Sequence, residues 1–416
     1  MKKTFKDYII VLFGSSFTRG IAFLNTILLA RWLRPEEFGK FSLFYFLMIL
    51  TWQLPQAFDM TYVRYAKTSN SDREKNDFLK TAIFFKLSFV ICILILATPL
   101  SYLLAQYCFQ KAEVQPLLVF AFITGGFLSF LMTIASIFQE KGQFTKYTFL
   151  YAFYTISVLI AVVVLHLGGY QFNLVNVILI YTGVSVVIGF VSMRILFKKV
   201  GALFDIHKNV LAQSLSLGKW IFGSTCVYFI FQRLDVLFLT RFVDFHSLGI
   251  YSVAAQMLMF LSLITGSLSG VFLPKASSAL TSKEALRLYV KESLIAVGVI
   301  NMLVIIIMIA APFLINILFG PTYSSAAPLF RILLWGWFFL IIYLPFSFLF
   351  FTLNDSKTGF MCELVKLFLG LGLLIYLVPV AGPKGAAVAI SAALIMSSIT
   401  AMVVLGQKIK LKFARS

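Results

Sequence analysis

Long apolar runs separated by short polar breaks are the feature that most constrains the fold of this chain. A helix that crosses a bilayer needs roughly 20 mostly apolar residues. Only 12% of the 416 residues are charged, whereas an ordinary soluble protein carries about 25%. The runs therefore predict an all-α integral membrane protein with twelve transmembrane helices, near residues 8–30, 41–65, 79–104, 114–138, 146–166, 173–197, 217–240, 247–273, 288–318, 325–352, 358–379 and 384–406.

The basic residues predict how these segments are oriented. Loops on the cytoplasmic side of a membrane carry an excess of Lys and Arg. If the N-terminus is cytoplasmic, 23 of the 35 basic residues fall at the cytoplasmic side and six at the outer side. We therefore expect a multi-pass protein with both termini in the cytoplasm. Most of the formal charge of +19 then reflects topology, and no nucleic-acid partner is needed to explain it.

An internal repeat relates the two halves of the chain. The stretch FLNTILLARWLRPEEFGKFS begins at Phe23, and RLDVLFLTRFVDFHSLGIYS begins at Arg233, an offset of 210 residues that places Asn25 opposite Asp235. A weaker match places Pro116 opposite Pro328. Half of the chain is 208 residues, so the offset fits duplication of a six-span unit. At the 210-residue offset the identical pairs include Arg31 and Arg241, Gly39 and Gly249, and Ser42 and Ser252.

The duplication predicts a domain organisation. Because six spans per half is an even number, both halves enter the membrane from the same side, and a parallel repeat has its pseudo-two-fold axis along the membrane normal. We expect a six-helix lobe over residues 1–200 and a second over residues 217–416. Residues 201–216 are expected to form an amphipathic linker on the cytoplasmic membrane surface.

Two motifs carry a resemblance to a known family. ARWLRPEEFGKFSLFY follows the first span, and LFGPTYSSAAPLFRIL precedes the tenth. With the span number and the duplication, these stretches resemble the Wzx-type oligosaccharide and polysaccharide lipid flippases of the multidrug/oligosaccharidyl-lipid/polysaccharide (MOP) exporter superfamily. The resemblance implies a MATE-like fold in a bacterial cytoplasmic (inner) membrane. It also implies that the protein moves a polyprenyl (undecaprenyl) diphosphate-linked glycan by alternating access. This glycan would be used in O-antigen, capsule or related surface polysaccharide.

Charged side chains inside membrane spans are costly and normally face a cavity or a partner. Arg64, Lys86 and Lys366 lie one to three turns from the cytoplasmic ends of their predicted spans, so snorkelling, a local ion pair or a substrate contact would each explain them. Glu363 lies three residues before Lys366, where the two side chains share a helix face. Arg331 is expected at the outer interface.

Arg19 and Arg233 are the two deepest basic residues. Arg19 is central in the first span, and Arg233 lies past the middle of the seventh. The resemblance implies that these two spans line a crevice between the halves, where guanidinium groups would bind a diphosphate bidentately. Alternatively, Arg233 is neutralised by Asp235 or Asp59. The predicted cationic cavity thus comprises Arg19, Arg233, Arg64, Lys86 and Lys366, with polar contributions from Asn25, Gln53, Gln56 and Gln232.

The energy source is constrained by what the sequence lacks. No G-x-x-x-x-G-K-[ST] phosphate-binding loop occurs, so ATP hydrolysis by that route is excluded. The carboxylates Asp59, Asp235 and Glu363 are candidates for proton or sodium coupling. Cysteines and histidines are scattered, which predicts neither a metal site nor a cofactor.

Three functional hypotheses remain from the sequence. The first is the lipid-linked glycan flippase, whose partners would be the membrane lipid and other membrane proteins of polysaccharide assembly. The second is an ion-coupled multidrug exporter, which predicts an acidic cavity, although in-span basic residues outnumber acidic ones six to three. The third is a membrane glycan polymerase or ligase, which would need a larger outer loop than this chain has.

Overall fold

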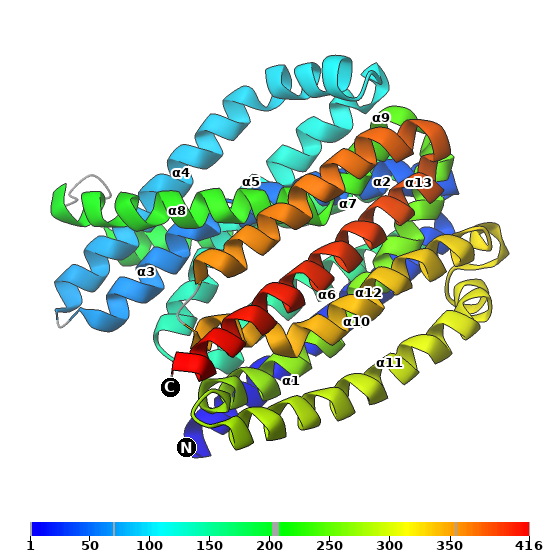
Figure 1. Cartoon of the computed structure of the whole chain (residues 1–416). Helices are drawn as coiled ribbons and strands as arrows, with labels where there is room; N and C mark the ends of the chain where they lie inside the picture. Colours follow the sequence, from blue (N-terminus) through cyan, green and yellow to red (C-terminus); the bar gives the residue numbers. More distant parts are fainter. Residues whose placement is uncertain (1, 70, 202–207, 354–355, 416) are drawn as a thin grey trace. The chain divides into compact units, whose positions relative to one another are not determined.

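The computed structural model describes residues 2–69, 71–201, 208–353 and 356–415. Within these ranges the chain is helical and contains no strand, which confirms the predicted all-α class (Figure 1). It divides into two compact units, residues 1–237 and 238–416, and the boundary falls within helix α9 (Leu234–Phe242).

Unit 1 is a bundle of long helices. The π-helical segment η1 (Leu104–Cys108) and the 3₁₀ turn η2 (Ala112–Val114) connect its fourth and fifth helices. The helices are α1 (Lys2–Trp32), α2 (Pro35–Gln53), α3 (Gln56–Thr68), α4 (Asp72–Leu103), α5 (Gln115–Glu140), α6 (Phe144–Leu167), α7 (Leu174–Val200) and α8 (Lys208–Gln232).

Helix α5 is the central helix of unit 1. It packs against α2, α3, α4, α6 and α7. Small residues allow this close packing, because a Cβ atom at Gly125 would lie 2.5 Å from the carbonyl oxygen of Met48 on α2. A Cβ atom at Gly189 of α7 would lie 2.6 Å from the carbonyl oxygen of Phe127 on α5. Close backbone contact at small residues is typical of helix association in membranes, where lipid is as apolar as the side chains.

Unit 2 has a corresponding central helix. Helix α12 packs against α10, α11 and α13. It follows the 3₁₀ turn η3 (Pro321–Tyr323), as α5 follows η2, and Pro116 and Pro328 lie in the first turn of α5 and α12 respectively. This correspondence supports the predicted duplication. The helices of unit 2 are α10 (Phe245–Ala279), α11 (Lys283–Phe319), α12 (Ala326–Thr352) and α13 (Ser356–Arg415).

Local capping interactions fix several helix boundaries. The side chains of Asn173, Asp244 and Ser282 accept hydrogen bonds from backbone N–H groups in the first turns of α7, α10 and α11. These bonds satisfy donors that the helix itself leaves unpaired. Gly201 and Gly320 follow α7 and α11 with φ of 71° and 94°, positive values that glycine adopts without the steric cost of a Cβ atom.

All twelve predicted spans lie in helical regions, but the helices differ from them in three places. Segment 41–65 is split between α2 and α3 at Leu54–Pro55, and segment 217–240 is split between α8 and α9 at Arg233. Segments 358–379 and 384–406 both fall in α13, whose helical geometry is interrupted at Gly382 with φ of 53° and ψ of −129°. Pro55 and Gly382 lie at the first and third of these interruptions, as is usual for breaks in helices, whereas no proline or glycine lies beside Arg233.

Nine helices of the described residues are long and apolar enough to cross a membrane, and one of them, Leu364–Lys410, contains most of the eleventh predicted span and all of the twelfth. The chain is thus a multi-pass membrane protein. The first part of the predicted linker 201–216, residues 202–207, lies outside the described residues, and α8 begins at Lys208. The domain boundaries proposed from the sequence stay a prediction.

Candidate functional site

Arg19 lies on a distinct face of α1. With 3.6 residues per turn, it is about 140° around the helix from Leu24 and about 20° from Thr26 and Ala30. Leu24 is exposed, whereas Thr26 and Ala30 are buried. Arg19 itself is exposed. Arg19 therefore lies in the N-terminal half of α1, on the helix face that is buried in the C-terminal half. It points away from the exposed apolar face.

Contacts with α6 and α7 hold α1 in this orientation. The Asn25 side-chain amide donates a hydrogen bond of 2.6 Å to the Tyr181 hydroxyl on α7. The Trp32 ring stacks on His166 at the end of α6, with ring centroids 3.9 Å apart. Because these contacts lie on the other side of the helix or near its end, they fix the rotation of α1 without using the guanidinium group. Among the described residues, Arg19 makes no hydrogen bond or ion pair with protein.

Lys86 of α4 is at the centre of a buried polar cluster. Its ammonium group donates to Asp59 Oδ2 of α3 at 2.5 Å, to Ser129 O of α5 at 2.9 Å and to Thr133 Oγ1 of α5 at 2.6 Å. Lys86 is 0% exposed. An ammonium group has three donors, and all three are used here. In this conformation Lys86 offers no donor to a ligand, so the geometry favours the local pair, one of the three explanations that the sequence leaves open.

Asp59 has one oxygen in this pair and one outside it. Its Oδ1 atom is buried without a hydrogen-bond partner among the described residues, and so is Oε1 of Gln53. Gln56 lies one turn before Asp59 on α3 and interacts with the Tyr151 hydroxyl of α6. The predicted polar residues Gln53 and Gln56 thus lie on the chain segment that carries the buried ion pair.

Arg233 occupies the break between α8 and α9. It is half-buried, and its positive charge interacts with the Tyr45 hydroxyl of α2. The following carboxylate, Asp235, is buried, and its Oδ1 atom accepts a hydrogen bond of 2.8 Å from the Val236 backbone N–H. Gln232, at the end of α8, is exposed. The sequence suggests Asp59 or Asp235 as the partner of Arg233. Because Asp59 is paired with Lys86, Asp235 is the carboxylate that remains near Arg233.

The remaining predicted site residues are Arg64, Lys366 and Glu363. Arg64 is exposed on α3, five residues after Asp59, and Lys366 is half-buried on α13 in unit 2. The side chain of Glu363 lies outside what the structure describes. Within unit 1, Lys86 and Asp59 are in direct contact, and Gln53 and Gln56 lie six and three residues before Asp59 along the chain.

Three polar residues in these contacts were not among the predicted site residues. Ser129 and Thr133 of α5 complete the coordination of Lys86, and Tyr181 is the partner of Asn25. The sequence does contain an indication of Ser129 and Thr133, because these polar residues are four apart and share one face of an otherwise apolar helix. Their contact with Lys86 could not be predicted, because they lie 43 and 47 residues from it along the chain.

The arrangement of helices matches solved structures of one class of transporter. The lipid II flippase MurJ in an inward closed conformation aligns with a TM-score of 0.74 and 16% identity, over 96% of this chain and 87% of that chain. A multidrug resistance MATE family transporter of the MOP superfamily, inward-facing, aligns with a TM-score of 0.69 and 15% identity over 95% of each chain. A third structure is a MOP superfamily transporter from Pyrococcus furiosus whose binding pocket is described as having reverse polarity. It aligns with a TM-score of 0.63 and 14% identity, over 98% of this chain and 96% of that chain. The chain therefore has the fold of these proteins.

The family follows from the sequence itself. Residues 4–280 match the profile of the family described as polysaccharide biosynthesis protein. The match covers more than half of the chain, which therefore belongs to this family. No curated protein sequence matches the chain. The membership of a polysaccharide-related family that the sequence motifs indicated is confirmed, and so is the MATE-like fold.

Proposed function

We propose that this protein is a flippase that moves a polyprenyl (undecaprenyl) diphosphate-linked oligosaccharide from the cytoplasmic to the outer leaflet of a bacterial inner membrane, by alternating access. The product would serve O-antigen, capsule or related surface polysaccharide synthesis. Membership of the polysaccharide biosynthesis family, together with the MOP fold, supports this assignment. The structural observation that carries it is an exposed Arg19, without a protein partner among the described residues, on the helix face that is buried in the C-terminal half of α1.

The chemistry of Arg19 suits a diphosphate. A guanidinium group presents several donors in a plane and binds phosphate oxygens bidentately. Arg233, Arg64 and Lys366 are further candidates for the anionic headgroup, and Gln53, Gln56, Gln232 and Asn25 for the sugars. We assign Lys86 to positioning the α3 segment, since its donors are already used within the protein.

Coupling to an ion gradient is a second part of the proposal. Asp59 and Asp235 are the in-span carboxylates whose side chains the structure describes, and both are engaged. Asp59 pairs with Lys86, and Asp235 accepts from a backbone N–H. Asp235, which lies beside the break between α8 and α9, is the better candidate for proton or sodium exchange. Other membrane proteins of polysaccharide assembly are the proposed partners.

The direct test is to delete the gene in its native host and identify the intermediate that accumulates. A flippase predicts a complete diphosphate-linked oligosaccharide in the inner leaflet, and surface polysaccharide that returns when the wild-type gene is restored. A polymerase or ligase predicts accumulation of the same unit in the outer leaflet. A multidrug exporter predicts no lipid-linked intermediate and a greater sensitivity to cationic drugs. Either of these last two results would contradict the proposal.

A further inference from the structure

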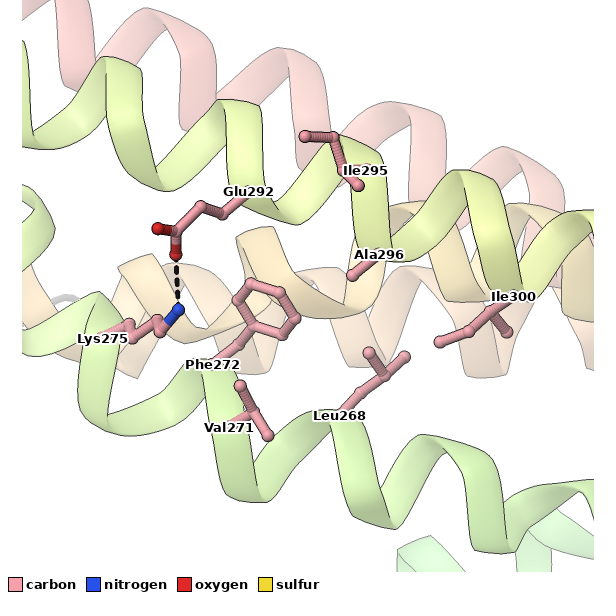
Figure 2. A pocket seen from close by; sticks show the side chains of 8 residues that line it. All are labelled: Leu268, Val271, Phe272, Lys275, Glu292, Ile295, Ala296 and Ile300. Atoms are coloured by element: carbon pink, nitrogen blue, oxygen red, sulfur yellow. Dashed lines mark hydrogen bonds and ion pairs between the residues drawn. The ribbon is translucent and has the colours of Figure 1, made fainter.

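A groove between α10 and α11 of unit 2 has a volume of about 560 Å³. Figure 2 shows Lys275 and Glu292 at one end and apolar side chains along its length. Phe272 and Leu268 are buried, whereas Val271 and Ile295 are 53% and 59% exposed. Ala296 and Ile300 complete the lining. Because the groove lies on a membrane protein and part of its apolar lining is exposed, it suits an apolar chain.

The charged end of the groove lies at the depth of lipid headgroups. Glu292 is the last charged residue of α11, and the 27 residues from Ser293 to Phe319 carry none. Their helical length, about 40 Å at 1.5 Å per residue, is more than enough to cross a hydrocarbon core of about 30 Å. Lys275 lies four residues before the end of α10, on the side of the short connection to α11. The groove thus runs from the membrane–water interface into the hydrocarbon.

The ion pair at this end is accessible. Lys275 Nζ lies 2.5 Å from Glu292 Oε2, and the two side chains are 49% and 39% exposed. The Lys275 ammonium also lies 5.9 Å from the centre of the Phe272 ring. Only one of its three donors is used by Glu292, and half-exposed pairs of this kind exchange partners at little cost.

The floor of the groove is held more firmly than the ion pair at its end. Phe272 packs edge-on against Tyr289, with ring centroids 5.9 Å apart. The Tyr289 hydroxyl donates a hydrogen bond of 2.6 Å to the carbonyl oxygen of Pro345 on α12. These contacts tie α10, α11 and α12 together beneath the groove, so its shape does not depend on the ion pair at its end.

We propose that this groove binds one acyl chain of phosphatidylethanolamine, with Lys275 on the lipid phosphate and Glu292 on the lipid ammonium. The protein pair is net neutral and so is this headgroup, so that both protein charges stay paired when it binds. An anionic lipid would take Lys275 and leave Glu292 without a partner. Phosphatidylcholine has no N–H to donate to Glu292. The proposal is independent of which glycan the protein transports.

The test uses the full-length protein in detergent with equal amounts of phosphatidylethanolamine, phosphatidylcholine and phosphatidylglycerol, and measures bound lipid by native mass spectrometry. The wild type should retain phosphatidylethanolamine in preference to the other two by about fivefold, as expected for one modest charge-assisted contact at each end. Equal retention of the three lipids, or a preference for phosphatidylglycerol, would overturn the proposal.

Variants separate the headgroup from the chain. Lys275→Gln and Glu292→Gln should each abolish the preference, whereas Lys291→Gln, next to Glu292 but outside the groove lining, should keep it. The exchanged pair Lys275→Glu with Glu292→Lys should also keep it, because a zwitterion can bind in either sense. A preference that survives Glu292→Gln contradicts the headgroup assignment.

A second pair of variants tests the groove itself. Ala296→Phe fills it and should lower the retention of all three lipids. Leu294→Phe adds a ring at an exposed residue outside the groove lining, about 160° around α11 from Ala296, and should leave retention unchanged. Equal retention by the wild type and Ala296→Phe would place the lipid elsewhere and overturn the proposal.

Discussion

Arg331 of α12 donates a hydrogen bond of 2.9 Å from Nε to the carbonyl oxygen of Met308 on α11. Its Nη2 atom also donates to the carbonyl oxygen of Ile309, at 3.3 Å. Pro312 lies four residues after Met308 within α11 and has no N–H to bond that carbonyl. A backbone carbonyl without a partner is costly in a membrane, and neighbouring helices commonly satisfy it. This arginine, predicted from the sequence at the outer interface, thus compensates for a proline in the next helix.

A double-mutant cycle tests this compensation. Arg331→Ala should lower the free energy of unfolding by about 1–2 kcal/mol, because the Met308 carbonyl loses its donor. In a Pro312→Ala background the loss should be smaller, since the substituted alanine supplies the helical N–H that proline lacks. Thermal or denaturant unfolding in detergent provides the measurement. Equal losses in both backgrounds would show that Arg331 acts through something other than the carbonyl that Pro312 leaves free.

The buried pair of Lys86 and Asp59 predicts strong non-additivity. Lys86→Met leaves an uncompensated carboxylate inside unit 1 and should destabilise the protein by about 3–5 kcal/mol. Asp59→Asn should also destabilise, because Lys86 then loses its counter-charge. The combined variant should be less destabilised than the sum of the two, as unfolding measurements in detergent would show. Additive losses would mean that the two charges do not depend on each other.

The predictable part of the fold and the unpredictable part have different physical origins. Span-length apolar runs placed all twelve helical segments, because a membrane leaves an apolar chain little alternative to helix. The breaks at Leu54–Pro55 and Arg233 and the kink at Gly382 were missed, since apolarity does not report local backbone geometry. Depth along the spans singled out Arg19 and Arg233 as candidates for the headgroup site, which stays a prediction. It did not reveal that Lys86 is neutralised, because its partners come from two other helices.

Gly125 should tolerate no side chain. A Cβ atom there would lie 2.5 Å from the backbone oxygen of Met48 and 2.6 Å from Cβ of Thr51. Gly125→Ala should therefore force α2 and α5 apart and cost about 1–3 kcal/mol of stability. Gly183→Ala is the matched control, because nothing lies within 4 Å of its added Cβ and alanine improves helix propensity by about 0.5–1 kcal/mol. Thermal unfolding should therefore rank Gly183→Ala at or above the wild type, and the reverse ranking would contradict the packing argument.

Topology can be tested at the two ends of α10. His246 and Thr281 are exposed, one in the first turn of α10 and the other just beyond its last residue. In a variant whose four native cysteines are replaced, a membrane-impermeant thiol reagent applied to whole cells should label His246→Cys and not Thr281→Cys. Both should react after permeabilisation. Labelling of Thr281→Cys alone in intact cells would reverse the predicted orientation.

The role of Arg19 has a control in the same unit. Arg73 is an exposed basic residue near the start of α4, outside the candidate site. Arg73→Ala removes the same charge and should restore surface polysaccharide to a deletion strain as the wild type does. Arg19→Ala should not restore it, although the protein should be present in the membrane at the same level. Failure of both variants would point to total basic charge rather than to a site at Arg19.

The most direct measurement follows translocation of a diphosphate-linked oligosaccharide in proteoliposomes that contain the purified protein. Arg19→Ala should slow translocation by about tenfold to hundredfold, the loss expected for hydrogen bonds to a charged group. Arg19→Lys should retain part of the rate, since it keeps the charge without the planar fork. Translocation by Arg19→Ala at the wild-type rate would contradict the account that this arginine binds the diphosphate.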